Sequence, residues 1–95
     1  MAVMNESEVE QSLNSLEGWQ REGEAISREF ELANFDAAIE LVNAVAGLAR
    51  ERDHHPDILL HDYKRLKLTL STHSEGGITA NDIELARAIN EILRG

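Results

Sequence analysis

The chain has 95 residues, no cysteine, and a formal net charge of −9. This length predicts one domain, and the lack of cysteine excludes disulfides, thiolate nucleophiles and cysteine-based metal sites. The acidic charge argues against direct nucleic-acid binding. No apolar run approaches the roughly 20 residues of a membrane span, and no secretory signal is evident, so we expect a cytoplasmic protein.

The first third of the chain predicts a short helix and a hairpin. Residues 5–16 have helical spacing, with Asn5 or Ser7 as the cap and Gly18 as the expected stop. Residues 18–32 predict a hairpin that turns near Gly23, and its second strand alternates with a period of two. Arg28 interrupts the apolar face of that strand. We therefore expect it to lie near a sheet edge, or to reach outward along the aliphatic part of its side chain.

The single tryptophan, Trp19, allows two interpretations. It can fill the core with its N–H bonded to a backbone carbonyl, or it can form a wall of a pocket for a flat ring. Its residue type alone favours the core.

The middle of the chain has the longest helical pattern, at residues 34–52. Asn34 is suited to cap it, and Pro56 disfavours helix at His55, so we expect the helix to end near Asp53 or His54. Seven apolar residues follow helical spacing. They are Phe35, Ala38, Ile39, Val42, Val45, Ala46 and Ala49.

The last third predicts two strands and a helix. Residues 57–60 and 64–72 read as strands around a turn at 61–63, with Leu66, Leu68 and Leu70 on one face. Thr79 can cap the amide of Asp82 at the start of a helix that runs to about residue 93. The element order indicates an α+β fold, with an antiparallel four-stranded sheet that carries three helices on one face.

The histidines are the candidates for chemistry. His54 and His55 are adjacent between Asp53 and Pro56, and His73 follows the second strand of the last pair. Adjacent histidines in extended chain point to opposite sides, and neither the i, i+4 helical spacing nor a Cys/His pattern is present, which argues against a metal site.

Proton transfer suits these residues better. Histidine titrates near neutral pH, and a nearby aspartate can fix its tautomer; Asp53 and Asp82 are both candidates for this. Each residue also has an ordinary structural interpretation. His61, next to Asp62 in a polar turn, is expected to be a surface residue, and Asp82 is expected to be a helix cap first.

The sequence resembles the pterin-4a-carbinolamine dehydratase family from about residue 13 to residue 92. The likeness lies in Asp-His-His-Pro at 53–56, Thr-His at 72–73, and Gly-Ile-Thr at 77–79 followed by Asp82. The Gly18-Trp19 pair and the Phe35 entry to the long helix also match. The resemblance implies one dehydratase-like domain over residues 1–95, and dimers that join sheets edge to edge, some pairing again into tetramers.

The resemblance also implies an activity, which is loss of water from 4a-hydroxytetrahydropterin to give quinonoid dihydropterin. This recycles the cofactor of aromatic amino acid hydroxylases and implies no metal and no bound cofactor. The residues carried over are His54, His55 and His73 as catalytic, Asp53 and Asp82 as supporting, and Trp19, His55 and Thr72 as substrate-binding. We expect His54 and His73 to transfer protons, His55 to orient the pterin, and Asp82 to hold the loop that carries His73.

One position departs from the family pattern, and one alternative stays open. Arg50 stands where the family often has glutamate, which puts the pocket role of that glutamate in doubt. The alternative is a non-catalytic binding, assembly or transcription-coactivator module on the same fold. The three retained histidines favour the enzyme.

Overall fold

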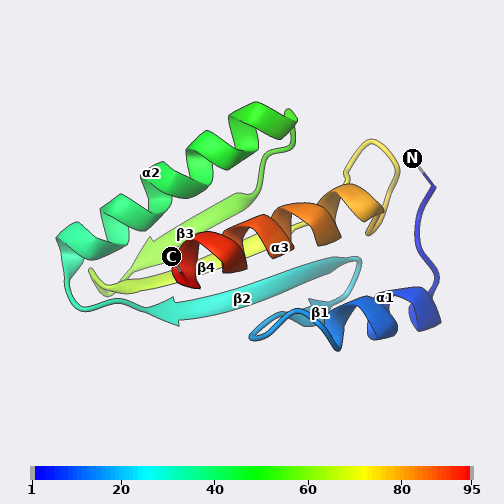
Figure 1. The fold of residues 1–95 in the computed structure, drawn as a ribbon, viewed down its shortest axis with the longest axis horizontal. Coiled ribbons are helices and arrows are strands. Elements are labelled where there is room, and N and C mark those ends of the chain that lie inside the picture. The colour runs from blue at the N-terminus through cyan, green and yellow to red at the C-terminus, as the bar shows by residue number, and fades with distance from the viewer. Residues whose placement is uncertain (1, 95) are drawn as a thin grey trace.

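A four-stranded antiparallel sheet forms the centre of the molecule (Figure 1). The computed structural model describes residues 2–94, and within them the strand order is β1-β2-β4-β3. The strands are β1 (Gln20–Glu22), β2 (Ala25–Glu31), β3 (Asp57–His61) and β4 (Arg65–Leu70). The helices are α1 (Glu6–Leu13), α2 (Phe35–Arg52) and α3 (Ala80–Arg94). Figure 1 shows α2 and α3 over the sheet, running roughly along its strands, and α1 beside β1, which confirms the predicted α+β fold.

The core is built on the apolar face of β4. Leu66, Leu68 and Leu70 are fully buried, as their alternation predicts. Lys67 lies between them on the other face, where its Nζ is 2.9 Å from Glu22 Oε2. Burial of each leucine stabilises the fold by about 1.5–3 kcal/mol, so this interior strand carries much of the stability.

Helix α1 starts where the sequence predicts and ends earlier. Asn5 Oδ1 accepts the Glu8 N–H at 2.9 Å, and Glu8 Oε1 accepts the Asn5 N–H at 2.8 Å, which forms a capping box. The helix ends at Leu13, so the prediction that it runs to residue 16 and stops at Gly18 was wrong. The N–H of Leu16 bonds back three residues, to the Leu13 carbonyl, and this tighter turn replaces the helix.

Helix α2 is capped as predicted, but its buried face differs from the predicted apolar stripe. Ile39, Val42 and Ala46 are half-buried, and Leu41, which the stripe omitted, is buried. Asn34 Oδ1 accepts the Ala37 N–H at 2.8 Å. Phe35 is 49% exposed, although it shares the spacing of the buried residues. Helical spacing shows which residues share a face of a helix, but not how far along the helix that face is covered by the rest of the protein. The buried residues of α2 are Ala38, Leu41, Val45 and Ala49.

The C-terminal strands and helix differ from prediction only at their ends. Strand β3 includes His61, which was placed in the turn, and β4 ends at Leu70 rather than at residue 72. At the start of α3, Thr79 Oγ1 accepts the N–H of Asn81 at 3.2 Å instead of that of Asp82. The Asp82 N–H bonds the Thr79 carbonyl oxygen at 3.0 Å.

Candidate active site

The end of α2 presents the histidine pair. Asp53 takes a left-handed conformation with φ 50°, which ends the helix, and Pro56 keeps the chain extended after it. The His54 N–H still bonds the Ala49 carbonyl oxygen at 3.1 Å, so this residue is fixed to the last turn. The His54 side chain is 12% exposed, whereas His55 is exposed. The helix end therefore turns one imidazole inward and leaves the next at the surface.

The buried partner of His54 is Asp82, in the first turn of α3. His54 Nε2 lies 2.5 Å from Asp82 Oδ1, and the Asp82 side chain is 0% exposed. The two residues are 28 positions apart, so the contact joins the C-terminal end of α2 to the N-terminal end of α3. Asp82, and not Asp53, is the aspartate that contacts His54.

The second oxygen of Asp82 accepts two further hydrogen bonds. The Thr72 hydroxyl and the Thr79 N–H each donate to Asp82 Oδ2 at 2.9 Å. The Thr72 and Thr79 hydroxyl oxygens are 2.8 Å apart, and all three residues are buried. The carboxyl group therefore has a polar partner on both oxygens, as a buried charge requires.

The loop that carries His73 is attached to the same carboxyl group. Thr72 forms an isolated bridge with Gly77, and the Thr72 carbonyl accepts the Gly76 N–H at 3.0 Å. The Gly76 N–H also lies 3.2 Å from the His73 carbonyl oxygen, and Gly76 has φ 77°, which suits glycine. His73 follows Thr72 directly and is exposed. Asp82 thus lies between His54 and the base of the loop that carries His73.

The structure brings together three of the predicted site residues. His54, Thr72 and Asp82 form one hydrogen-bonded group, while His55 and His73 are exposed neighbours of two of its members. Thr79 belongs to this group, although the sequence singled it out as a helix cap and as part of the Gly-Ile-Thr likeness, not as a site residue. Its capping position was the signal, since the acidic residue of a capping box accepts the backbone N–H of the cap residue.

Trp19 lies in a different part of the fold. Its side chain is 6% exposed, and its N–H donates to the side chain of Asn90 at 2.9 Å, not to a backbone carbonyl as the core interpretation expected. Asn90 follows Asp82 by eight residues on α3, which is about 12 Å along the helix. The Trp19 N–H is therefore anchored well away from Asp82.

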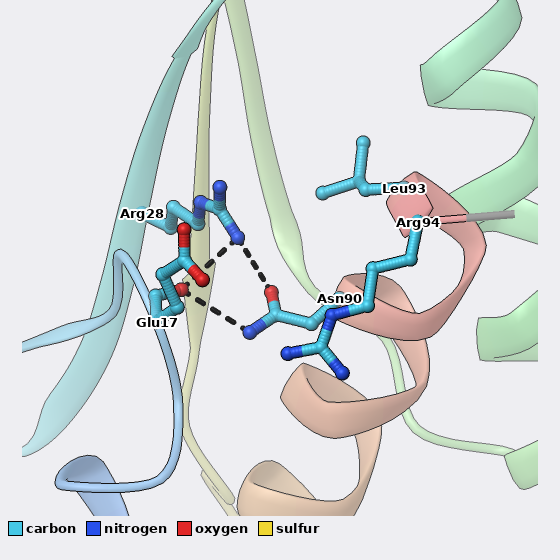
Figure 2. Close-up of a pocket in the computed structure, with 5 residues that line it drawn as sticks. All are labelled: Glu17, Arg28, Asn90, Leu93 and Arg94. Carbon is cyan, nitrogen blue, oxygen red and sulfur yellow. Dashed lines mark hydrogen bonds between the residues drawn. The ribbon is translucent and has the colours of Figure 1, made fainter.

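A small pocket lies beside this tryptophan anchor (Figure 2). It has a volume of about 190 Å³, and Figure 2 shows Arg28, Glu17 and Asn90 joined by hydrogen bonds at its wall. Arg28 Nη1 donates to Asn90 Oδ1 at 2.6 Å and to the Glu17 carbonyl at 3.0 Å. Strand β1 pairs with β2 no further than Ser27, so at Arg28 only β4 pairs with β2, which agrees with the expected place of Arg28 near a sheet edge. Gly18 has φ 85°, a left-handed conformation that favours glycine, and a Cβ there would also meet Arg28 Nε at 2.4 Å.

The fourth histidine stands apart from the candidate site. His61 Nδ1 lies 3.1 Å from Asp62 Oδ2, and the His61 side chain is 41% exposed. This agrees with its expected surface position. Among residues 2–94, no helix has both the length and the apolar composition to cross a bilayer.

Comparison with known proteins points to one family. The sequence profile of the pterin 4 alpha carbinolamine dehydratase family matches residues 2–92. A relative from Sulfolobus acidocaldarius, provisionally named pterin-4-alpha-carbinolamine dehydratase, is 43% identical over 89 residues, which cover 94% of this chain and 97% of that one. A relative from Roseiflexus castenholzii with the same provisional name is 44% identical over 92 residues, which cover 97% of this chain and 98% of that one.

Two solved structures resemble the fold. The crystal structure of a transcriptional coactivator/pterin dehydratase from Brucella melitensis superposes with a TM-score of 0.89 at 40% identity, and covers 95% of this chain and 97% of that one. A pterin dehydratase-like protein, identified as a RuBisCO assembly factor in the alpha-carboxysome, gives a TM-score of 0.61 at 17% identity, and covers 78% of this chain and 84% of that one. At that identity the second likeness concerns the fold alone.

Proposed function

The chain belongs to the pterin 4 alpha carbinolamine dehydratase family, and from this we propose that it removes water from a 4a-hydroxytetrahydropterin to give a quinonoid dihydropterin. In this reaction the bond between C4a and the hydroxyl oxygen breaks. The hydroxyl leaves as water after it takes up a proton, and a ring N–H gives up a proton. No electrons are exchanged with a second reactant, so acid–base groups suffice for the chemistry.

The observation that carries this proposal is the contact between His54 and Asp82. A buried carboxylate at 2.5 Å from Nε2 holds the imidazole in one orientation, which is what a proton-transfer group needs. The ring is 12% exposed, so it is anchored yet open to the surface on one side. We assign His54 to one proton transfer for this reason.

The second proton transfer is assigned to His73. Its neighbour Thr72 donates to the same Asp82 carboxyl group that contacts His54, so the base of the His73 loop is held close to His54. In this proposal His55, exposed beside His54, orients the pterin ring. Asp82 positions both histidines.

The remaining predicted residues take less direct roles. Thr72 uses its hydroxyl, N–H and carbonyl on partners inside the protein, so we propose that it serves the substrate by placing His73. In this proposal Trp19 stabilises the core beside the site, because its ring is buried and its N–H is bonded to Asn90. Asp53 supports the site as the residue that ends α2.

A direct assay tests the proposal. Synthetic 4a-hydroxytetrahydropterin loses water slowly without a catalyst, and we expect the purified chain to accelerate this loss in proportion to enzyme concentration. Removal of metal with a chelator is expected to leave the rate unchanged, because the proposed chemistry uses only side-chain protons. A rate equal to the uncatalysed one would overturn the proposal and favour a non-catalytic binding or assembly module. We place the reaction in the cytoplasm, as part of cofactor recycling.

The exposed edge of β3 supports a homodimer. This strand ends the sheet, and Ile58 and Leu59 on it are 40% and 54% exposed. An unpaired edge with apolar side chains is a ready surface for pairing with another strand. We propose that β3 of two copies pair, which would join the two sheets into one.

A charge on β3 is expected to separate the dimer. Leu59→Lys would bring two like charges together at the shared edge and weaken dimerisation by about 10–100-fold. Light scattering over a concentration series measures this. Ile92→Lys, at an exposed apolar position on α3, is the matched control and is expected to leave the dimer intact. A wild-type chain that stays monomeric at high concentration would contradict the proposed pairing.

A further inference from the structure

The hydrogen bonds around Asp82 have a direction, which follows from counting protons. The Thr79 N–H can only donate, and the Thr72 hydroxyl has one proton, which it gives to Asp82 Oδ2. The Thr72 oxygen must then accept in its 2.8 Å contact with Thr79, so the Thr79 hydroxyl is the donor there. The Thr79 hydroxyl oxygen in turn accepts the N–H of Asn81. Every proton in this chain of bonds is directed toward the carboxyl group.

This direction determines the tautomer of His54. With two donors on Oδ2, the carboxylate is satisfied in its ionised form, and an ionised carboxylate can only accept. If the carboxylate is ionised, it can only accept at Oδ1 as well, and the 2.5 Å contact there then places a proton on His54 Nε2. When the imidazole is neutral, its lone pair lies on Nδ1.

We propose that His54 exchanges its proton with the substrate through Nδ1, and that Thr72 and Thr79 are positioning residues that enforce this choice. The inference rests on the proposed dehydration and specifies which atom performs it. Nε2 is held in contact with a fully buried carboxylate, so Nδ1 is the ring nitrogen left to meet the substrate. Nδ1, once protonated, gives its proton to the leaving hydroxyl; the C4a–O bond breaks, water departs, and the ring N–H proton passes to the second base. Protons and electrons balance without any further reactant.

The tautomer can be measured directly. Two-bond proton–nitrogen correlation spectra of the chain with ¹⁵N-labelled histidine, recorded where the ring is neutral, report which nitrogen carries the proton. We expect the wild-type His54 ring to be protonated on Nε2. A wild-type ring protonated on Nδ1 would overturn the inference. This measurement uses the wild-type chain alone, so it does not depend on whether a variant folds.

The variant Asp82→Asn should reverse the tautomer. Its amide oxygen is expected to keep the Thr72 and Thr79 donors, so its NH₂ group would face Nε2 and move the ring proton to Nδ1. Asp53→Asn is the matched control, and its tautomer should stay as in the wild type. An Asp82→Asn spectrum identical to that of the wild type would contradict the role given to the two threonines.

Kinetics separate this inference from the proposed function. Thr72→Val removes one donor to Asp82 and is expected to lower kcat about tenfold with little change in KM, while Thr72→Ser should restore most of it. Equal loss in the valine and serine variants would overturn the positioning role. No turnover in the wild type would overturn the dehydratase proposal. Turnover by a wild type whose His54 is protonated on Nδ1 would overturn only the assignment of the working nitrogen.

Discussion

Alanine at position 54 is expected to lower kcat for pterin dehydration by about 10²–10⁴-fold, because it removes a positioned acid–base group. His73→Ala is expected to lower kcat by a similar factor, since two proton transfers are needed and each has its own histidine in our proposal. Rapid-mixing absorbance measurements on synthetic 4a-hydroxytetrahydropterin would give both rates. The loss should appear in kcat more than in KM, as the lost interaction acts in the transition state.

Two further variants make this result specific. His54→Gln keeps a side-chain N–H that can reach Asp82 but cannot exchange a proton near neutral pH, so it should be as slow as alanine while the fold is retained. His61→Ala removes an exposed histidine whose ring contacts only its neighbour Asp62 among the described hydrogen bonds, and it should retain wild-type turnover. Near-normal activity of both His54 variants would remove His54 from the reaction.

Asp82→Ala is expected to lower the free energy of unfolding by about 2–4 kcal/mol. The substitution removes the acceptor of the Thr79 N–H, the Thr72 hydroxyl and His54 Nε2, and buried donors without a partner cost about 1–3 kcal/mol each before the structure relaxes. The Thr72 hydroxyl can still turn to Thr79, which limits the loss. Urea unfolding followed by circular dichroism measures the change.

The chain contains a matched control for this effect. Asp36 is also an aspartate in the first turn of a helix, but it is exposed. Asp36→Ala removes only a favourable interaction with the helix dipole, worth about 0.3–1 kcal/mol. Equal losses in Asp36→Ala and Asp82→Ala would show that burial of the Asp82 network contributes little to stability.

Much of the fold could be predicted because local rules decide it. The alternation of Leu66, Leu68 and Leu70 fixed the buried face of β4, and Asn34 and Pro56 bounded α2. One error lies at the end of α1, where a further α-helical turn and the tighter turn that forms instead are close in energy. Another lies at Phe35, where burial depends on how far a covering layer extends.

The site was predictable in its residues but not in its connections. The sequence named His54, Thr72 and Asp82, yet offered both Asp53 and Asp82 as partners of the histidine. Only the meeting of the ends of α2 and α3 selects Asp82, and this depends on tertiary packing between residues 28 positions apart. The same limit applies to the Trp19 bond with Asn90, which joins residues 71 positions apart.

The claim on which the account depends is that His54, His55 and His73 face one ligand. Histidine-ring NMR spectra recorded during titration with 7,8-dihydropterin, which resembles the product, test this most directly. We predict that the ring signals of His54, His55 and His73 shift together with one dissociation constant, while those of His61 stay in place. If the His73 ring does not respond, or responds with a different dissociation constant from His54, the three histidines do not share a site.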